Sequence, residues 1–246
     1  MRREDARAHF VKRAQKYDSS SRWVDDPQLI RKISALADAG TSSIVLDIAV
    51  GTGKLASAFH GKVKLVVGVD ICPQMASHAR GGTDSIVLAP AENLPFKDNS
   101  FDACVCRQGL QFMDLSRAIP EIQRVLKPGG SFVACHLTSY GEEDKETAFL
   151  IQRLRNPARK NFFLPGDIPA LFRKNGFVDI VPLDYISRES VMQWITHGAI
   201  GKDRMDKIME AYRNAPEEFK KTHGVSFVEG DILDSMKLVI VRAKKP

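Results

Sequence analysis

The sequence predicts an α/β fold: a seven-stranded, mostly parallel sheet with helices on both faces, an antiparallel last strand and a helical insertion before that strand. Short apolar runs, several rich in valine, alternate with amphipathic segments along the chain, which is typical of buried parallel strands joined by helices. The first two runs each end at an acid, Asp47 and Asp70. Because ligands of such sheets bind at the carboxyl ends of the strands, these acids mark the expected site.

Turn and stop signals set the order of the elements. Pro73 is suited to the first turn of a helix, and residues 127–130 carry the basic, proline and glycine signals that end one. Two further helices are expected over 142–155 and 165–177. The predicted strands are 45–47, 63–70, 85–89, 103–106, 131–136, 178–187 and 236–242.

The turn after the first strand narrows the class of ligand. Gly51 and Gly53 lack a Cβ, so the backbone can approach a ligand, and the helix expected after them offers unpaired N–H groups. A Walker loop is excluded, because its first glycine and its Ser/Thr are missing at the required spacing. A dinucleotide fingerprint stays open, since Gly51-x-Gly53-x-x-Ala56 matches it and Asp70 lies at a suitable distance. The third alternative is a loop for S-adenosylmethionine (SAM), with Asp47 facing an amino-acid moiety.

Five motifs favour the SAM loop. Asp-x-Ala-x-Gly-Thr-Gly begins at Asp47, Val-Gly-Val-Asp ends at Asp70, and Ala-Glu-x-Leu-Pro-Phe, Ser-Phe-Asp and Arg-Val-Leu-Lys-Pro-Gly-Gly follow in order. The segment 43–136 resembles the class I SAM-dependent methyltransferases of the ubiquinone/menaquinone-biosynthesis type, whose fold is Rossmann-like. The N-terminal Phe10-x-x-x-Ala14-x-x-Tyr17-Asp18 resembles the short helix that such enzymes fold over the cofactor. We therefore expect lid helices over 1–40 and the SAM-binding domain over 41–246.

The resemblance also implies a set of cofactor-binding residues at the strand ends and on the lid. The methionine part of SAM would be lined by Asp47, Ala49, Gly51 and Gly53, and its sulfonium would lie near Arg107 and Gln108. The ribose hydroxyls would be bound by Asp70, and the adenine would be sandwiched by Ile71 and Met75, with Ala91 and Glu92 at its edge. Tyr17 would close the site from the lid.

Two departures from the family pattern bear on the chemistry. Many relatives have Gly-Asp-Ala where this chain has Ala89-Pro90-Ala91, so the acid that bonds the adenine amino group is missing. The expected consequence is either weaker SAM binding or a substitute contact from Glu92. Relatives also often carry a histidine near Gln111-Phe112, which this chain lacks. Our candidate bases are therefore His136 and Tyr17, with Tyr140 and His197 as further alternatives. A structural role for His136 is the competing interpretation.

The predicted function is methyl transfer from SAM to a small-molecule or thioester-bound acceptor by in-line displacement, with S-adenosylhomocysteine as product. Alignment supplies most of such catalysis, and a base is needed only when the acceptor is protonated. One alternative is an NAD(P)-dependent oxidoreductase, which uses the same glycines but leaves residues 90–96 and 127–130 unexplained. Another is a non-catalytic SAM-binding regulatory protein, because Pro90 and Gln111 depart from the pattern.

Composition limits the setting. A chain of 246 residues suits one α/β domain, and no apolar run approaches the roughly 20 residues that span a membrane, so we expect a cytoplasmic protein. The net charge of +6 favours an anionic acceptor, but 36 basic residues are dispersed among 30 acidic ones, which argues against nucleic acid. The clearest basic cluster, 153–160, is either a solvated helix end or a docking patch for an acidic or thioester substrate. The four cysteines are expected to be buried thiols, with no metal site.

The insertion 188–234 is the least familiar segment, because relatives usually join the last two strands by a short hairpin. It is expected to form two or three helices. Together with the N-terminal helices and residues 142–161 it would cover the acceptor pocket. The alternative is a packing or dimerisation element, and hence a homodimer. Trp194, Met192 and Met209 are expected in the core rather than against the acceptor.

Overall fold

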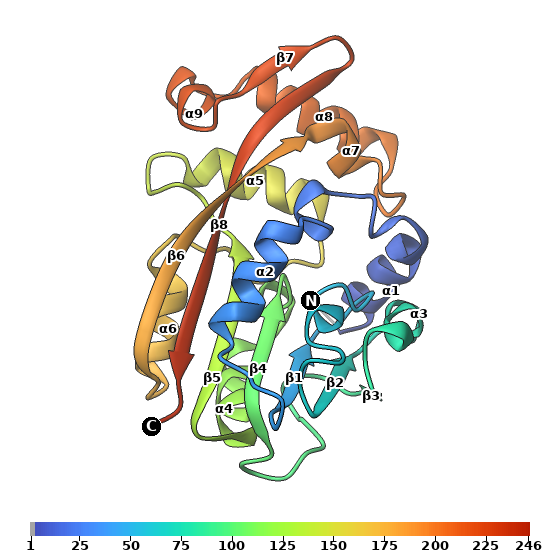
Figure 1. Cartoon of the computed structure of the whole chain (residues 1–246). Helices are drawn as coiled ribbons and strands as arrows, with labels where there is room; N and C mark the ends of the chain where they lie inside the picture. The colour runs from blue at the N-terminus through green and yellow to red at the C-terminus, as the bar shows by residue number, and fades with distance from the viewer. Residues whose placement is uncertain (1–2) are drawn as a thin grey trace.

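The computed structural model describes residues 3–246, which form one mixed β-sheet (Figure 1). The strand order is β3-β2-β1-β4-β5-β8-β6, and a short strand, β7, pairs with β8 off this path. The pairs among β1 to β5 are parallel, whereas β8 is antiparallel to both β5 and β6. This confirms the predicted Rossmann-like sheet with its antiparallel last strand. The strands are β1 (Ile44–Ile48), β2 (Leu65–Asp70), β3 (Ser85–Leu88), β4 (Phe101–Arg107), β5 (Leu126–Leu137), β6 (Val178–Ser190), β7 (Ser226–Val228) and β8 (Asp231–Lys244).

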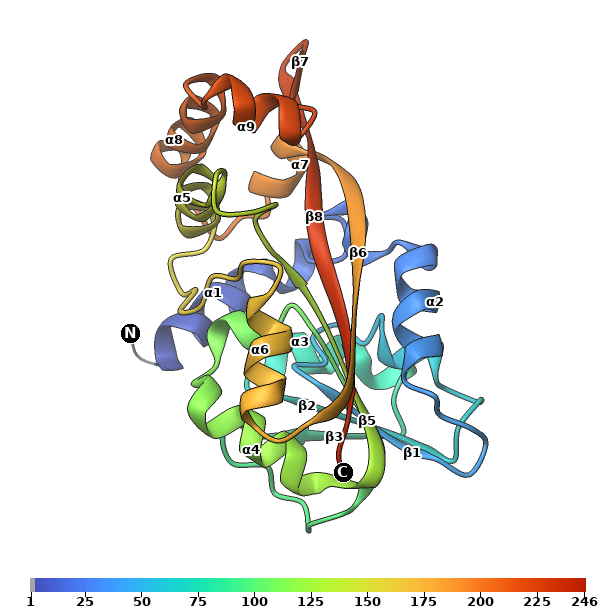
Figure 2. The same ribbon diagram turned by 90° about the vertical axis from the view of Figure 1, so that its left-hand side faces the viewer.

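Helices cover both faces of the sheet. Figure 2 shows α4 and α6 on one face and α2 on the opposite face. Helices α5, α7, α8 and α9 gather at one end, beside the extended part of β6 and β8 (Figure 1). The helices are α1 (Arg3–Arg13), α2 (Pro27–Leu36), α3 (Pro73–His78), α4 (Leu115–Val125), α5 (Lys145–Arg155), α6 (Asp167–Lys174), α7 (Val191–Ile195), α8 (Lys202–Arg213) and α9 (Glu217–Thr222).

The side chains of the central strands are divided between two separate hydrophobic cores, one on each face of the sheet. In β5, Phe132 and Ala134 lie in the core under α4 and α6, whereas Val133 and Cys135 lie in the core shared with α2 and the insertion. Successive strand residues point to opposite faces, so a strand covered on both sides has to be apolar throughout. This explains why the central strands read as continuous apolar runs. Cys104 and Cys106 share one face, and all four cysteines are buried and free, as predicted.

The segment after Gly53 differs from the prediction. It contains only a short 3₁₀ turn, Ala56–Ala58, instead of an apolar helix. The connection from β1 to β2, residues 49–64, otherwise consists of turns and bends. The N–H groups of a helix N-terminus, which we expected to face the ligand, are therefore not supplied here.

The insertion is shorter than predicted, because both strands beside it are longer. Strand β6 continues to Ser190 and β8 begins at Asp231, which leaves 191–230 for helices α7, α8 and α9 and the strand β7. The three helices agree with the prediction, and β7 was missed. Helix α8 packs against α5, so the insertion and the segment after β5 form one layer.

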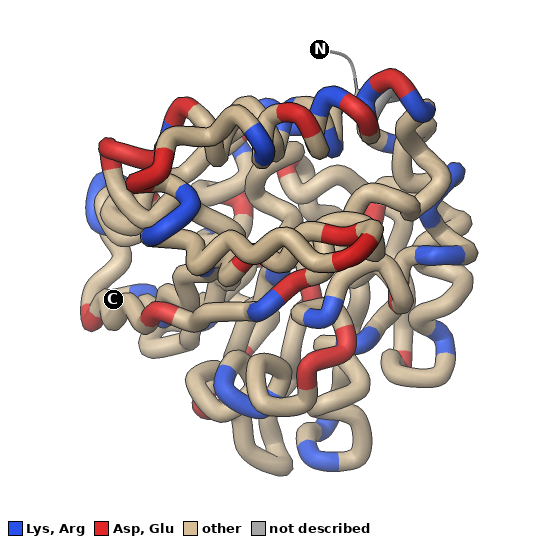
Figure 3. The backbone as a smooth tube through the Cα atoms, turned by 90° about the horizontal axis from the view of Figure 1, so that it is seen from above, with Lys and Arg blue, Asp and Glu red and all other residues tan. Residues whose placement is uncertain are grey.

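The distribution of charge and the hydropathy of the helices, over the described residues, agree with what the composition predicts. Acidic and basic positions are interspersed over the face seen in Figure 3, without a continuous basic stripe. No helix within residues 3–246 has the length and apolar character needed to cross a bilayer.

A buried ion cluster ties the insertion to the sheet. His223, which follows α9, bonds Asp144 through Nε2 and Asp234 of β8 through Nδ1, both at 2.9 Å. Tyr212 of α8 donates to the same Asp234 at 2.6 Å. Burial alone would lower the pKa of His223, but the bonds to Asp144 and Asp234 outweigh it and raise the pKa to about 9.

This cluster predicts a pH dependence of stability. Because the pKa of His223 is higher in the folded chain than its usual 6.5, its stabilisation is complete below pH 6.5 and is lost as the pH rises through about 9. We expect the free energy of unfolding to fall by about 2–3 kcal/mol across that window. Urea denaturation at several pH values should show this decline in the wild type and in the exposed-site control His78→Gln, but not in His223→Gln. Equal slopes in all three proteins would contradict it.

Candidate cofactor and acceptor site

The loops after β1 and β2 are held together by one carboxylate. Asp70, at the end of β2, accepts hydrogen bonds from the backbone N–H of Gly51 at 2.9 Å and of Cys72 at 2.8 Å. Gly51 (φ +56°) and Ala49 (φ +57°) both adopt the left-handed conformation in this loop. That conformation costs a non-glycine residue roughly 1–2 kcal/mol, so Ala49 is a strained position of the kind found at functional sites.

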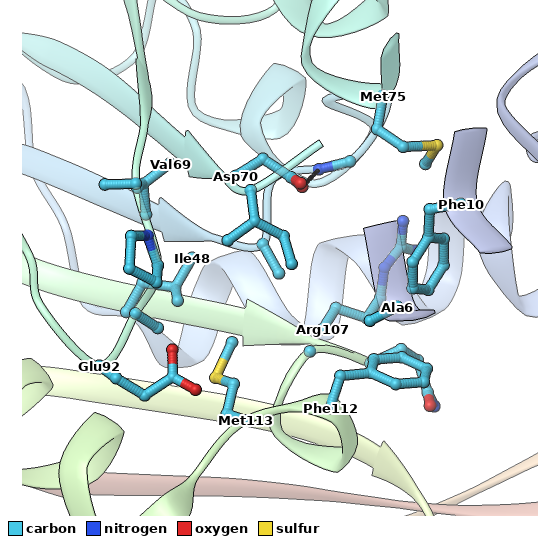
Figure 4. Close-up of a pocket in the computed structure, with 18 of the residues that line it drawn as sticks. Ala6, Phe10, Ile48, Val69, Asp70, Met75, Glu92, Arg107, Phe112 and Met113 are labelled. Atoms are coloured by element: carbon cyan, nitrogen blue, oxygen red, sulfur yellow. Dashed lines mark hydrogen bonds between the residues drawn. The ribbon is translucent and has the colours of Figure 1, made fainter. Parts of the chain in front are cut away.

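A cavity of about 780 Å³ lies beside these loops (Figure 4). Asp70, Glu92 and Arg107 contribute charged groups to an otherwise apolar lining. Ten of the predicted residues line it: Tyr17, Ala49, Gly51, Asp70, Ile71, Met75, Ala91, Glu92, Arg107 and Gln108. A mostly apolar lining with a few convergent polar and charged groups is typical of a ligand site.

Asp47 lies in a smaller hollow of about 270 Å³ that shares Tyr17, Ala49, Gly51 and Arg107 with the large cavity. The side chain is 2% exposed, and its Oδ2 has no hydrogen-bond partner among the described residues. Burial raises the pKa of Asp47 to about 7, against the opposing charge of Arg107. A buried carboxylate oxygen without a donor fits a ligand that brings a cation or an N–H group, such as the amino-acid end of SAM.

Gly53 does not line either space, which corrects the prediction. A Cβ at this position (φ +81°) would lie 2.8 Å from Cα of Ala79, just after α3. The glycine is therefore required for the close packing of the loop against the segment after α3. The sequence pattern alone does not separate a glycine that faces a ligand from one that faces a neighbouring helix.

Several cavity residues were missed by the sequence reasoning as binding residues. Phe112 and Met113 follow β4, and Ala6 and Phe10 come from α1. The rings of Phe10 and Phe112 meet edge to face with centroids 5.0 Å apart, which closes α1 over the cavity. The N-terminal motif signalled Phe10, whereas nothing in the local sequence distinguishes Phe112 from a core residue.

Glu92 borders the large cavity. Its Oε1 accepts a hydrogen bond from the backbone N–H of Asp114 at 3.0 Å, and Pro90 and Ala91 lie beside it in the lining.

A second cavity of about 390 Å³ adjoins the first. The two share four residues, Phe10, Tyr17, Gln108 and Phe112. The remaining lining comes from the N-terminal segment, the 3₁₀ turn after β4, the end of β5, the segment 152–159 and helix α7: Arg13, Trp23, Gln111, Leu137, Gln152, Arg155, Asn156, Arg159 and Trp194.

The insertion thus contributes one residue to the second cavity. Trp194 of α7 belongs to the core cluster and lines the cavity as well, so the expectation that it serves only the core was incomplete. Met192 and Met209 pack against the core, as expected.

The candidate bases lie in different places. Tyr17 lines both cavities and the hollow at Asp47. His136 is fully buried and lines none of them. Its Nδ1 bonds Oε1 of Gln111 at 2.9 Å, and Gln111 in turn donates to Gln108 at 3.1 Å. Burial lowers the pKa of His136 to about 3, so the ring is neutral. Tyr140, which donates to the carbonyl of Ser235, and His197 also lie outside both cavities.

This fold, with acids at the ends of its first two strands and a largely apolar cavity beside them, defines a class I SAM-dependent methyltransferase. A family model described as a methyltransferase domain matches residues 46–134. The chain is also 30% identical over 230 residues to an uncharacterized methyltransferase of Bacillus subtilis, YcgJ, with 87% of each chain covered. The protein therefore belongs to the methyltransferase domain family and is an enzyme of this class.

Other comparisons agree. The crystal structure of YcgJ matches with a TM-score of 0.81 at 25% identity, covering 88% of this chain and 97% of that one. An uncharacterized protein of Methanocaldococcus jannaschii, MJ1123, is 37% identical over 190 residues, which is 73% of this chain and 86% of that protein. A demethylmenaquinone methyltransferase of Corynebacterium kroppenstedtii is 38% identical over 96 residues, 39% of this chain and 42% of that protein.

Two glycines allow a test of the packing role of Gly53. Gly53 and Gly61 both have positive φ, but a Cβ at Gly61 would meet nothing within 4 Å. We expect Gly61→Ala to cost about 1 kcal/mol of unfolding free energy and Gly53→Ala about 2–4 kcal/mol, because only the latter adds overpacking to backbone strain. Thermal and urea denaturation measure both. Similar losses would show that the contact with Ala79 relaxes freely.

Proposed function

We propose that SAM occupies the large cavity and that a small-molecule acceptor occupies the second one. The observation that carries this proposal is the wall common to the two cavities, formed by Phe10, Tyr17, Gln108 and Phe112. Methyl transfer needs the acceptor atom, the methyl carbon and the sulfur in one line where the two cavities meet, and alignment of this kind supplies most of the rate enhancement. The acceptor side is lined chiefly by buried side chains, which favours a small molecule over a carrier-protein thioester.

The residues around the large cavity then take the following roles. Asp47 would accept from the amino group of the methionine part, with Arg107 beside it for the carboxylate. Asp70 would bind the ribose hydroxyls, and Ile71 and Met75 would enclose the adenine. Each of these side chains borders the large cavity or the hollow that adjoins it.

The lid in this proposal is shorter than residues 1–40. Helix α1 and Tyr17 line the cofactor cavity, and Trp23 lines the second one. The lid is tied to the glycine loop, because Thr52 donates to Asp18 at 2.6 Å. Helix α2 instead buries Leu29 and Ile33 in the core against the sheet, so we assign it to the main domain.

The chemistry asks for positioning more than for acid–base groups. Bound SAM supplies an electrophilic methyl group: the acceptor atom bonds its carbon with a lone pair while the carbon–sulfur pair returns to sulfur, which becomes a neutral thioether. Gln108 and Tyr17, on the common wall, would orient the acceptor atom. His136 would act through Gln111, which it holds toward Gln108. We therefore propose His136 as a positioning residue, and Tyr17 as the hydroxyl available to an acceptor that must lose a proton.

Family membership settles the two alternatives raised by the sequence. The chain is a SAM-dependent methyltransferase, which excludes the oxidoreductase and a solely regulatory role for the fold. Release of S-adenosylhomocysteine with a panel of small acceptors tests the finer assignment.

The role of Asp70 has a matched control in Asp102. Both carboxylates accept from a backbone N–H, but Asp102 bonds Ile44 at 2.8 Å at the amino ends of the strands, away from the cavity. We expect Asp70→Asn to raise the Kd for S-adenosylhomocysteine at least tenfold, about 1.4 kcal/mol, because an amide cannot accept both loop N–H groups. Calorimetry should place Asp102→Asn within twofold of the wild type. Equal losses in the two variants would argue against the assignment.

Asp47 predicts a pH dependence of cofactor binding. Its pKa of about 7 in the free protein means that the carboxylate is protonated below that pH. Since the ionised form attracts the ligand's ammonium group, we expect S-adenosylhomocysteine to bind several-fold more weakly at pH 5.5 than at pH 7.5. Asp47→Asn should bind weakly at both values. A wild-type Kd that stays constant over this interval would refute the contact.

A further inference from the structure

The second cavity carries an excess of buried positive charge. Arg13 and Arg155 are only 2% and 6% exposed, and Nε of the partly buried Arg159 is itself shielded from solvent. Among the side chains of residues 6–246, no carboxylate lies within ion-pair distance of these three guanidinium groups. A buried charge without a partner costs several kcal/mol, so a protein keeps three of them side by side only for a reason.

Glu189 lies near enough to Arg155 to offset part of this charge, but it forms no ion pair with it. Its carboxylate accepts the backbone N–H of Arg22 at 2.8 Å and of Trp23 at 3.1 Å, and it is also bonded by Ser187. The guanidinium groups instead contact neutral partners. Arg13 donates to the hydroxyl of Ser20, and Arg155 donates to the carbonyl of Trp194 and lies over its ring.

The lining is also rich in hydrogen-bond donors that have no acceptor. Seven buried nitrogen atoms of cavity residues lack a partner among the described residues: Arg13 Nε, Trp23 Nε1, Gln108 Nε2, Arg155 Nη2, Asn156 Nδ2, Arg159 Nε and Trp194 Nε1. Buried polar groups in native proteins are nearly always satisfied. Seven orphan donors around one cavity therefore indicate a ligand that supplies several acceptor oxygens.

The field of this charge is visible in neighbouring side chains. Burial, together with the charges of Arg13 and Arg155, lowers the pKa of His9 to about 3 and that of His197 to about 2. Burial also lowers the pKa of Arg13 to about 10 and that of Arg159 to about 9. Both values stay above neutral pH, so these groups remain cationic.

We propose that the second cavity is an oxyanion site, in which Arg13, Arg155 and Arg159 bind the carboxylate or phosphate group of a small acceptor. Guanidinium groups bind either oxyanion through paired N–H donors. The three arginines line only the second cavity, and none belongs to the wall shared with the large one. The anionic group therefore anchors the acceptor by binding the arginines. A different atom of the same molecule, the one that is methylated, faces Gln108 and Tyr17.

The remaining walls describe the rest of this acceptor. Trp23, Trp194, Phe10, Phe112 and Leu137 offer aromatic and aliphatic surface. These apolar walls favour an anion with a compact aromatic or short aliphatic body. This inference rests on the proposed use of the second cavity for the acceptor, but the binding of an anion there is testable by itself.

Tryptophan fluorescence provides the readout. The sequence contains two tryptophans, and both Trp23 and Trp194 line this cavity. Full-length protein saturated with S-adenosylhomocysteine is titrated with benzoate, phenyl phosphate and the uncharged benzamide, with calorimetry in parallel. We expect saturable binding of at least one anion and at least tenfold weaker binding of benzamide. The tighter of the two anions identifies the oxyanion as carboxylate or phosphate.

Arginine variants separate a binding role from a structural one. Arg159→Gln and Arg155→Gln should weaken anion binding at least tenfold while the Kd for S-adenosylhomocysteine stays within twofold. Because each removes an unpaired buried charge, thermal stability without anion should be unchanged or higher. Arg153→Gln is the matched control: Arg153 lies on the same helix as Arg155 but is exposed and outside the cavity, so anion binding should change less than twofold.

The outcomes distinguish this inference from the proposed function. If S-adenosylhomocysteine binds but benzamide binds as tightly as the anions, or Arg153→Gln weakens anion binding as much as Arg155→Gln and Arg159→Gln do, the oxyanion site is wrong and the methyltransferase assignment stands. If the anions bind only in an arginine-dependent way and S-adenosylhomocysteine does not bind, the cofactor cavity is wrongly assigned. A loss of thermal stability in both cavity variants, without loss of anion binding, would show that the arginines are structural and overturn the inference.

Discussion

The pair of hydrogen bonds made by Asp70 is the interaction on which the site depends. One carboxylate holds the N–H of Gly51 and that of Cys72, so the loops after β1 and β2 have a fixed spacing. That spacing lets Ala49 and Gly51 remain in the left-handed conformation, where an untethered loop would relax. Burial raises the pKa of Asp70 despite those two bonds. The geometry of the large cavity is therefore set by a single buried acid at a strand end.

Much of this arrangement can be predicted from the sequence, because it depends on local patterns of residues. Asp47, Asp70 and the glycine turn sit at strand ends, and valine-rich runs identify the strands around them. The role of Gly53 was misjudged, because its contact with Ala79 joins segments that only the fold brings together. The ends of β6 and β8 also differ from the prediction, since both strands continue past their apolar runs toward the insertion. A periodic pattern gives the type of an element more reliably than its bounds.

The second cavity shows the opposite case. Arg155 and Arg159 lie in a basic run that usually marks a solvated surface, yet the structure buries them beside Arg13, which is far away in the sequence. Only tertiary packing reveals that these charges share a space with two indoles. Burying these charges lowers the stability of the protein when no ligand is bound. The extensive hydrophobic cores on both faces of the sheet offset that loss of stability.

The two cavities are also built from different parts of the chain. The large one is formed by α1 and by the loops that follow β1 to β4, whereas much of the second one comes from the segment after β5 and from α7. The family model covers 46–134 and ends before that later segment begins. The two cavities can therefore diverge separately. A graft meant to carry the second cavity onto a related scaffold would need Arg13 and Trp23 of the N-terminal segment as well as residues 142–161 and 191–230.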